Sequence, residues 1–282
     1  ASTRWRMTCS IRSKSSWVKG RGMTSLRGPF SLSINEEIGC LVEGFDTPPM
    51  ILMPHHRPYQ GGLIEKAGYT KLKDVFAWSY TPSEVSPRAR RAAEEIERLP
   101  EVTWRPIDLK HMERDIRIGM EIFNDAWADN WGFVPLTEAE LKKMASDMKL
   151  LLDPALTMIV FVEGEPAGIC IALPDLNDSL KGLDGKLTLA NLARLLWRLK
   201  VVRPQRARLI LLGIRRKLRH VRKYAALSAF MYTKINEIGR RIHIREAELS
   251  WTLEDNGPVN AGIRMMGGKI YKTYRIYQRV LS

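Results

Sequence analysis

The chain has 282 residues, of which 45% are hydrophobic and 27% charged, and its formal net charge is +14 at pH 7. This composition is typical of a soluble globular protein with one large or two small hydrophobic cores. Three scattered cysteines without a CxxC pair argue against a disulfide framework or a zinc site, and they favour a reducing cytoplasm. The apolar runs fall short of the ~20 residues that span a bilayer, and residues 1–27 contain no secretory signal, so we expect no membrane partner.

Positive charge is concentrated in two stretches that contain no acid. Residues 1–27 carry seven Arg and Lys, and residues 185–236 carry fourteen. Such a block favours an anionic partner, which could be a phosphorylated cofactor, nucleic acid or an acidic protein. A solvated basic face with no partner is the alternative.

The first part of the chain divides into three segments. Residues 1–26 show neither a helical nor a strand period, and we interpret them as a disordered or non-native segment. Residues 27–80 contain short apolar runs, a helix that ends at Gly68, and a strand at 74–80 with one aromatic face. Residues 81–100 combine Pro and Ser breakers with a charged helix, which is typical of a linker.

Residues 101–282 give a clear series of helices and strands. A capping box in which Thr137 faces Glu140 opens one helix, and Gly164 joins two strands in a hairpin. The predicted elements in chain order are strand 102–105, helices 109–128 and 137–151, strands 156–163 and 165–173, helix 189–199, strand 208–213, helix 224–241, strand 247–252, helix 258–266 and strand 269–280. This order predicts an α/β (α+β) fold in which helices flank a mixed, mostly antiparallel sheet.

Two stretches of this second unit resemble the GNAT (GCN5-related N-acetyltransferase) superfamily. In the stronger one, ELSWTLEDN at 248–256 precedes a short helix, Gly267-Gly268 and the last strand. In the weaker one, the strand 209–213 precedes a basic loop and a long helix. The runs FNDAWADNWGF and YKTYRIY look like those of uncharacterised bacterial GNAT-like proteins.

The resemblance implies a GNAT-like acyltransferase domain at 101–282. Strands 208–213 and 247–252 should then lie side by side and diverge at their C-terminal ends. In the GNAT fold that divergence forms the slot for the pantetheine arm of the acyl donor.

A shift of 199 positions aligns residues 56–80 with the end of the chain. Ile64 then meets Ile263 and Gly68 meets Gly267, so that each side is a short helix, a Gly stop and an aromatic strand. This suggests that residues 27–80 are a partial GNAT-like half-domain and that the chain is a truncated tandem, with chance similarity as the alternative. The repeat predicts that residues 50–80 superpose on 249–279 as strand, helix and strand.

The resemblance also implies acetyl-CoA as a cosubstrate. The family's loop Arg-Gly-x-Gly-x-Gly/Ala, whose glycines let phosphate oxygens approach the backbone, falls on RHVRKY at 219–224, which has no glycine. Basic side chains would therefore have to hold the phosphates. The residues expected to bind the cofactor are Leu211, Leu212, Gly213, Arg219, Arg222, Lys223 and Asn256.

A GNAT enzyme needs a base for the amine and often uses a Tyr as the acid for the leaving thiolate. The usual Tyr position, seven residues after Asn256, holds Ile263 in this chain, which leaves Tyr224 or Tyr232 as the acid. The candidate bases are Glu248, Glu254 and Asp255. Ordinary strand-end and N-cap roles for these carboxylates are the alternative.

The segment 124–133 combines aromatic and amide side chains, and in the GNAT architecture it borders the acceptor site. The candidate substrate-binding residues are Asn124, Trp127, Asn130 and Trp131. Packing between two helices is an alternative role for these aromatic residues. His55 and His56 point apart on a strand and have no third ligand nearby, so we expect no metal site.

Three functions follow from these observations. The first is an acyl-CoA-dependent N-acyltransferase with acetyl-CoA as the donor and a small amine or amino-acid-like molecule as the acceptor. The second is a non-catalytic GNAT-like domain that binds a CoA ester or another anion. The third is a basic nucleic-acid-binding protein, although aromatic residues are sparse in the basic stretch and no known nucleic-acid motif is visible.

Overall fold

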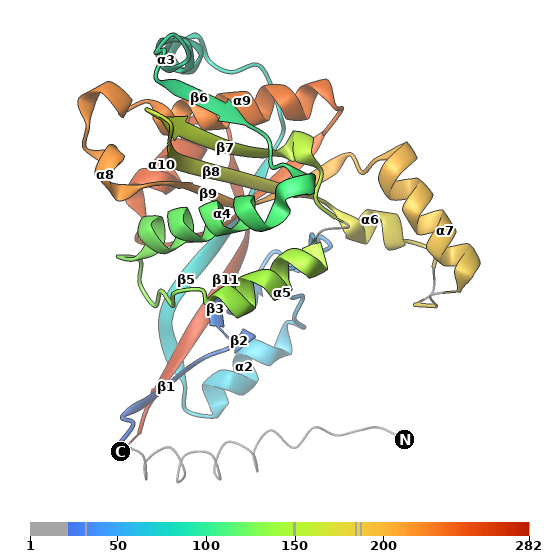
Figure 1. The fold of residues 1–282 in the computed structure, drawn as a ribbon. Coiled ribbons are helices and arrows are strands. Elements are labelled where there is room, and N and C mark those ends of the chain that lie inside the picture. The colour runs from blue at the N-terminus through green and yellow to red at the C-terminus, as the bar shows by residue number, and fades with distance from the viewer. Residues whose placement is uncertain (1–21, 32, 149–150, 184, 187, 282) are drawn as a thin grey trace.

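The computed structural model describes residues 22–281 except 32, 149–150, 184 and 187 (Figure 1). Its strands are β1 (Ser25–Gly28), β2 (Phe30–Ser31), β3 (Ser33–Ile38), β4 (Cys40–Glu43), β5 (Thr70–Tyr80), β6 (Val102–Arg105), β7 (Thr157–Val162), β8 (Glu165–Pro174), β9 (Arg206–Ile214), β10 (Glu246–Leu253) and β11 (Lys269–Val280). Its main helices are α2 (Tyr59–Lys66), α3 (Pro87–Glu97), α4 (Met112–Trp127), α5 (Glu138–Met148), α6 (Leu176–Leu180), α7 (Leu189–Trp197), α8 (Arg216–Arg219), α9 (Leu227–Arg241) and α10 (Gly257–Met265).

One large sheet organises the molecule. Its strand order is β1-β11-β5-β10-β9-β8-β7-β6, with β4 also paired to β11, and β2 pairs with β3 in a separate ribbon. All pairs in the large sheet are antiparallel except β9 with β10. This arrangement confirms the predicted mixed, mostly antiparallel sheet flanked by helices.

Helices cover both faces of the sheet. Figure 1 shows α4 and α5 in front of the sheet, α9 and α10 behind it, and α3 at the edge beside β6, where it packs against α9. Behind the sheet, Phe230 and Met231 of α9 and Ile96 of α3 belong to one large buried cluster with strand residues, whereas Ile122 of α4 packs on the front with Ile159 and Ile169.

Local sequence signals set the start of helix α5. The Thr137 backbone amide and hydroxyl both donate to Glu140, as the capping box predicted. No helix in the described part of the chain is long and apolar enough to cross a membrane.

Strands β9 and β10 pair only at their N-terminal ends. The parallel register runs from Arg206 opposite Glu246 to Leu209 opposite Leu249, and beyond these residues the two strands no longer pair. The predicted neighbouring strands that diverge at their C-terminal ends are therefore confirmed.

Strand β5, from the first part of the chain, lies between β10 and β11 in the same sheet. The helix, glycine and strand of α2–Gly68–β5 match α10–Gly267–β11 at the predicted offset, and both glycines have positive φ (+83° and +94°). The repeat predicted that residues 50–80 begin with a strand, and this part of the prediction is wrong. Leu52 has a φ of +59° and the Met53 backbone amide donates to the Met50 carbonyl, which turns the chain there.

The division of the chain into units at 27–80, 81–100 and 101–282 stays a prediction, since strands from both sides of residues 81–100 form one sheet. The segment expected to be disordered or non-native falls mostly on residues 1–21, outside the described residues. Of its remainder, Ser25 and Leu26 belong to β1.

Helix α4 is fastened to the edge of the sheet through Asp115. This carboxylate is fully buried and accepts hydrogen bonds from the guanidinium Nη2 of Arg105 at 2.7 Å, from Nε of Arg114 at 2.9 Å and from the Asp108 amide at 2.8 Å. Desolvation by burial would raise the pKa of Asp115, but these donors outweigh it and lower the pKa from 3.8 to about 2.

Because the pKa of Asp115 is lowered in the folded state, its contribution to stability is present above the unfolded pKa and is lost as the pH falls through about 2. A shift of this size corresponds to about 2 kcal/mol. Between pH 4 and pH 2 we expect wild type to lose about 2 kcal/mol more unfolding free energy than Asp115→Asn. Urea unfolding at a series of pH values measures this difference, and parallel pH profiles for the two proteins would contradict it.

Candidate functional site

A buried ion pair lies where β9 and β10 begin to diverge. Glu248 on β10 has a fully buried side chain, and its Oε1 lies 3.2 Å from Nε of Arg208 on β9, whose side chain is only 3% exposed. The pair sits on the last paired stretch of the two strands, next to the unpaired residues that follow Leu209 and Leu249. Glu248, a predicted catalytic residue, is therefore placed at the divergence.

Two hydroxyl groups complete the shell of the Glu248 carboxylate. The Ser250 hydroxyl donates to Oε1 and the Tyr271 hydroxyl of β11 donates to Oε2. Ser250 also accepts a hydrogen bond from Nε of Arg208 at 3.1 Å. Glu248 has no exposed surface, whereas Ser250 is partly exposed, so Ser250 links the carboxylate to the outside of the cluster.

Arg208 ties this cluster to the segment that crosses the front of the strands. Its Nη1 donates to the carbonyl oxygens of Ile51 and Leu52, each at 2.8 Å, and its guanidinium lies 4.4 Å from the centre of the Trp251 ring. Burial lowers the pKa of Arg208, and the charge of Glu248 opposes that shift. The pair is thus a charged unit in a largely dehydrated place, where each group depends on the other.

Tyr271 is held as a neutral hydrogen-bond donor. Burial raises the pKa of Tyr271, and the neighbouring Glu248 carboxylate raises it further. Burial also raises the pKa of Tyr274, whose hydroxyl donates to the Pro54 carbonyl. Both phenols therefore keep their protons at neutral pH, and Tyr271 can stabilise negative charge on Glu248.

The loop after β9 is bound by the end of α4. The Arg216 amide donates to Asp125 at 2.7 Å, and the Arg216 guanidinium donates to Asp129 at 2.9 Å. Arg219, expected to hold phosphate, instead donates to the carbonyl oxygens of Ile214 and Ala126, which joins the end of β9 to α4. In this structure, Arg219 therefore connects two parts of the protein.

Trp127 covers the strand beside the divergence. A Cβ on Gly213 would lie 2.2 Å from the Trp127 ring, so the indole fits only because residue 213 is a glycine. The ring stacks on Phe123 at 4.9 Å between centroids. Leu211 and Leu212 are paired to β8 and lie in the half of β9 that β10 leaves unpaired. Leu211, Leu212, Gly213 and Trp127 are therefore all brought to the divergence.

Other predicted residues lie away from it. Tyr224 is buried, and its hydroxyl donates to Glu101, which stands just before the edge strand β6. Strands β7, β8 and β9 lie between β6 and β10, the strand that carries Glu248. Lys223 forms an ion pair with the same Glu101. Arg222 is exposed and, like the exposed Lys217, has no carboxylate within ion-pair distance among the described residues.

The carboxylates that follow β10 are tied to β5. Glu254 pairs with Lys71 at 2.8 Å, and Asp255 pairs with Lys73. Asn256 is the N-cap residue of α10 without a side-chain cap bond, and Asn260 one turn later donates to the Leu253 carbonyl at 2.9 Å. These contacts favour a structural role for Glu254 and Asp255.

Of the candidate substrate-binding residues, Trp127 lies at the divergence, whereas Asn124, Asn130 and Trp131 make contacts elsewhere. Asn124 uses both ends of its amide on the backbone of Leu136, which fixes the connection between α4 and α5. The backbone N–H of Asn130 donates to the Trp127 carbonyl, and Trp131 lies beside Lys73, whose ammonium is 5.5 Å from the ring centre. Asn124 and Trp131 therefore hold α4 and its loop against neighbouring segments.

His56 forms a hydrogen bond within the protein. Nδ1 of His56 accepts a hydrogen bond from the Leu41 amide at 3.1 Å, and burial lowers its pKa. No group of three or more His, Cys, Asp or Glu residues in the described part of the chain is placed to hold a metal ion.

Sequence reasoning missed Arg208, Ser250 and Tyr271. Arg208 stands in the otherwise apolar stretch ARLILLG, and a charged residue at an inward-facing strand position signals a buried partner. Ser250 stands two residues after Glu248 on the same strand, a spacing that places both side chains on one face. Tyr271 carried no such signal, because it meets Glu248 only when β10 and β11 are placed around β5.

The divergence and the adjoining loop fit a CoA thioester in part. The unpaired edges of β9 and β10 match the position expected for a pantetheine arm. The backbone amide of Arg216, however, donates to Asp125. The side chains of Arg215, Arg216 and Lys223 form ion pairs, and Arg219 donates to backbone carbonyls. Among the described residues of the loop 215–224, the Lys217 and Arg222 side chains are therefore the cations without such partners. Bound phosphates would thus be held by these two side chains.

This chain is similar in sequence to curated proteins over most of its length. A protein of Caulobacter vibrioides named bacterial ceramide synthase is 39% identical over 273 residues, which cover 96% of this chain and 71% of that protein. Protein YghO of Escherichia coli is 36% identical over 265 residues, which cover 93% of this chain and 67% of YghO. No protein-family model matches the sequence.

Solved structures show the same fold at low sequence identity. A GCN5-related N-acetyltransferase from Sphaerobacter thermophilus aligns with a TM-score of 0.55 and 15% identity, over 99% of this chain and 70% of that one. A tandem GNAT protein from the clavulanic acid biosynthesis pathway aligns with a TM-score of 0.52 and 10% identity, over 100% of this chain and 72% of that one. The predicted resemblance to the GNAT superfamily is confirmed at the level of the fold.

Glu248→Gln tests the buried pair, because it leaves the Arg208 cation without a counter-charge inside the protein. We expect the free energy of unfolding to fall by about 3–5 kcal/mol. The matched change Glu254→Gln removes a partly exposed partner of Lys71 and should cost about 0.2–1 kcal/mol. Urea unfolding measures both values, and equal losses would show that the Arg208–Glu248 pair is not a stabilising unit.

Proposed function

The chain belongs to the family that includes the Caulobacter vibrioides protein named bacterial ceramide synthase and Escherichia coli YghO, and from this premise we propose that it is an N-acyltransferase. The reaction would move an acyl group from a thioester to an amine. The GNAT fold of the structural neighbours supports an acyltransferase at this level.

The position of Glu248 at the divergence of β9 and β10 carries the proposal. A thioester laid between the unpaired strand edges would bring its acyl carbon close to the cluster of Glu248, Ser250 and Tyr271. The cluster contains a carboxylate, a partly exposed hydroxyl in contact with it, and a phenol that holds the carboxylate in place. These are the groups required to take a proton from an attacking amine.

We propose a fatty-acyl CoA thioester as the donor and a long-chain amino alcohol as the acceptor. Ceramide is the amide of a fatty acid and a long-chain amino alcohol, so the name of the Caulobacter relative supports this pair over acetyl-CoA and a small amine. A CoA thioester supplies an acyl carbon that is activated for attack, and Lys217 and Arg222 would hold its phosphates.

Ser250 would relay the proton of the attacking amine. Its hydroxyl oxygen accepts that proton while its own proton passes to Oε1 of Glu248, along the hydrogen bond already present. The amine nitrogen forms its bond to the acyl carbon, the carbon–sulfur bond breaks, and the proton on Glu248 is later returned to solvent or to the thiolate. Arg208, through its ion pair, and Tyr271, through its hydrogen bond, would keep the carboxylate in position through the cycle.

A non-catalytic domain is the second candidate. It is favoured by the contacts of Arg216 with Asp125 and Asp129, which occupy donors that a phosphate would use. Such a domain would bind a CoA ester or another anion without turnover.

Ser250→Ala should lower kcat by about 10²–10⁴-fold, as expected for the loss of a proton-transfer group. The Arg208–Glu248 pair stays intact in this variant, so the protein should fold. The assay follows thiol release from acetyl-CoA and palmitoyl-CoA, each with a long-chain amino alcohol and with a small amine. Glu254→Gln is the control and should retain wild-type kcat. Wild-type activity in Ser250→Ala would contradict the relay, and no turnover by wild type with any pair would favour the non-catalytic domain.

Lys217 and Arg222 provide a separate test of the donor. Changing both to Ala should weaken CoA-ester binding by about 2–4 kcal/mol, because each lost charged hydrogen bond is worth ~1.5–3 kcal/mol and the losses do not add fully. Calorimetric titration measures the dissociation constants. The variant Arg57→Ala/Lys66→Ala, which removes two exposed charges around α2, is the control. An unchanged constant in the Lys217/Arg222 variant would refute capture by these side chains.

A further inference from the structure

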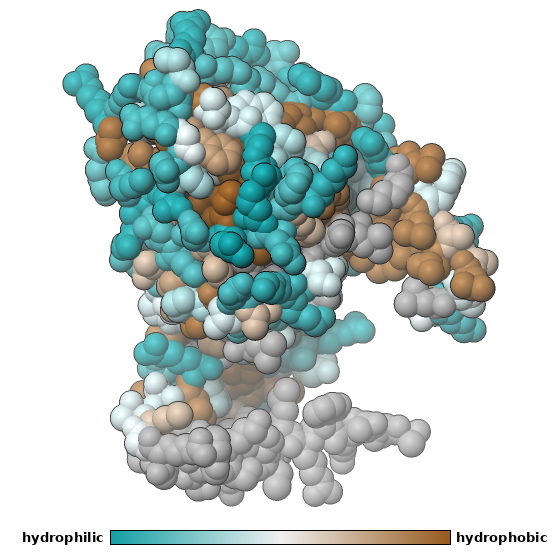
Figure 2. Space-filling view, in the orientation of Figure 1, coloured by the Kyte–Doolittle hydropathy of each residue, from teal (hydrophilic) through white to brown (hydrophobic). Residues whose placement is uncertain are grey.

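Helix α7 and the π-helical turn η3 (Arg198–Val202) form an apolar arm that projects from the body of the protein (Figure 1). Within this arm Leu195 is buried, whereas Leu189 is 87% exposed and Trp197 is 55% exposed. Its exposed large apolar residues are Leu189, Leu192, Leu196, Trp197, Val201 and Val202. Figure 2 shows these hydrophobic atoms gathered on the arm, away from the sheet. An apolar ridge of this kind marks a contact surface.

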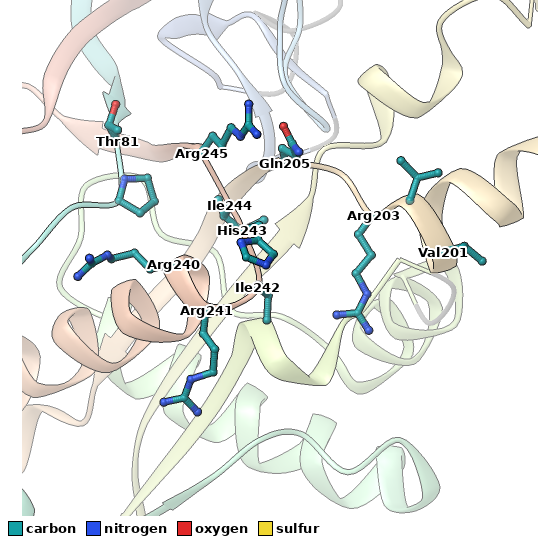
Figure 3. A pocket seen from close by; sticks show the side chains of 12 residues that line it. Thr81, Val201, Arg203, Gln205, Arg240, Arg241, Ile242, His243, Ile244 and Arg245 are labelled. Carbon is teal, nitrogen blue, oxygen red and sulfur yellow. The ribbon is translucent and has the colours of Figure 1, made fainter.

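A cationic hollow adjoins the arm. It has a volume of about 930 Å³ and lies between the end of α9, the start of β10 and the residues that follow η3 (Figure 3). Its lining contains Arg203, Arg240, Arg241 and Arg245 together with His243, and it contains no Asp or Glu. Four guanidinium groups therefore surround one depression.

Most of this charge is not neutralised by the protein. Arg240 lies 3.9 Å from Glu84, whereas Arg203, Arg241 and Arg245 have no carboxylate within ion-pair distance in the described part of the chain. All four arginines are exposed. Figure 3 shows the guanidinium groups pointing in different directions around the hollow, so each is open to an anion of its own, and phosphate is an anion that guanidinium binds well.

The arm and the hollow form one continuous surface. Val201 and Val202 belong to the arm, are 65% and 56% exposed, and also line the hollow. Arg203 follows them directly, and its amide donates to the Arg198 carbonyl at 2.9 Å, which turns the chain from the arm into the hollow. Arg203 and Ile244 also line a smaller apolar crevice of about 170 Å³ next to it. Apolar side chains and cations without carboxylate partners among the described residues therefore lie on one surface.

We propose that the arm and the arginine hollow dock the protein on the surface of a bilayer that contains anionic phospholipids. The apolar side chains would enter the boundary between headgroups and acyl chains, Trp197 would lie at the interface, and the guanidinium groups would bind lipid phosphates. The expectation of no membrane partner rested on the absence of a spanning segment, and surface docking needs none. The proposal goes beyond the acyl transfer and does not depend on it.

The chemistry of the surface distinguishes this partner from two others. Nucleic acid would use the cations but would leave the aliphatic ridge exposed to water. A second copy of the chain, docked by the same surface, would bring the two arginine hollows together without counter-charges. An anionic bilayer satisfies both the ridge and the hollow.

Co-sedimentation with vesicles tests the proposal. Wild type should bind vesicles of phosphatidylglycerol and phosphatidylcholine at least tenfold more tightly than vesicles of phosphatidylcholine alone. Trp197→Gln/Val201→Gln removes apolar area, and Arg203→Gln/Arg241→Gln removes charge. Each should weaken binding to the anionic vesicles at least tenfold, and all four positions are exposed, so both variants should fold. Arg57→Gln/Lys66→Gln loses the same charge around α2 and should bind like wild type.

Every contrary outcome is recognisable. Equal vesicle binding by wild type and both variants would overturn the proposal. Binding of a short DNA duplex without vesicle binding would identify the hollow as a nucleic-acid site. A dimer in sedimentation velocity that Trp197→Gln/Val201→Gln abolishes, again without vesicle binding, would identify the partner as a second copy. Activity on soluble substrates should be unchanged in both variants, so failure of docking and failure of the proposed reaction are distinguishable.

Discussion

Buried charged groups hold the segment 44–53 across the front of the sheet, and the candidate site depends on them. Lys272 of β11 donates to the carbonyl oxygens of Gly44 and Thr47, Arg208 of β9 donates to those of Ile51 and Leu52, and Asp175 accepts from the Ile51 amide. Burial of such groups is costly unless their hydrogen bonds and charges are satisfied. Each contact therefore helps to fix both the segment and the strand beneath it.

Glu248 connects this arrangement to the divergence of β9 and β10. It neutralises Arg208 on one side and accepts from Tyr271 and Ser250 on the other. The carboxylate is thus fixed in space by residues of β9, β10 and β11, which is the kind of pre-organisation that a proton-accepting group requires. The same contacts leave Glu248 without exposed surface, whereas Ser250 is partly exposed.

The basic stretch of the chain serves three different purposes in the fold. Arg208 is buried with Glu248, Arg216 and Arg219 bind α4, and Arg203 faces the open hollow beside the arm. Net charge describes only the sum of these roles. The positive charge is divided between two regions. One is the basic loop at the divergence, which carboxylates at the end of α4 partly neutralise. The other is the cationic hollow beside the apolar arm. The proposed donor site and the proposed docking surface therefore use different residues.

Local patterns in the sequence were sufficient for the fold class and for much of its layout. The Thr137 capping box, the hairpin at Gly164 and the glycine stops at Gly68 and Gly267 all depend on backbone preferences of a few neighbouring residues. The resemblance to the GNAT superfamily added the divergence of β9 and β10, and it placed Glu248 among the candidates. These features were predictable because short segments encode them.

Only the tertiary structure placed β5 between β10 and β11, and with it the partners of the site. Arg208, Glu248 and Tyr271 are far apart in the sequence and meet because strand order, rather than chain order, decides which side chains share a buried face. Tertiary packing also decided the roles of Asn124 and Arg219. Their residue types suggested ligand binding, but their side chains form hydrogen bonds with the backbones of Leu136 and Ala126. A sequence shows which groups can donate or accept a hydrogen bond, but the packing of distant segments decides which of those groups remain free.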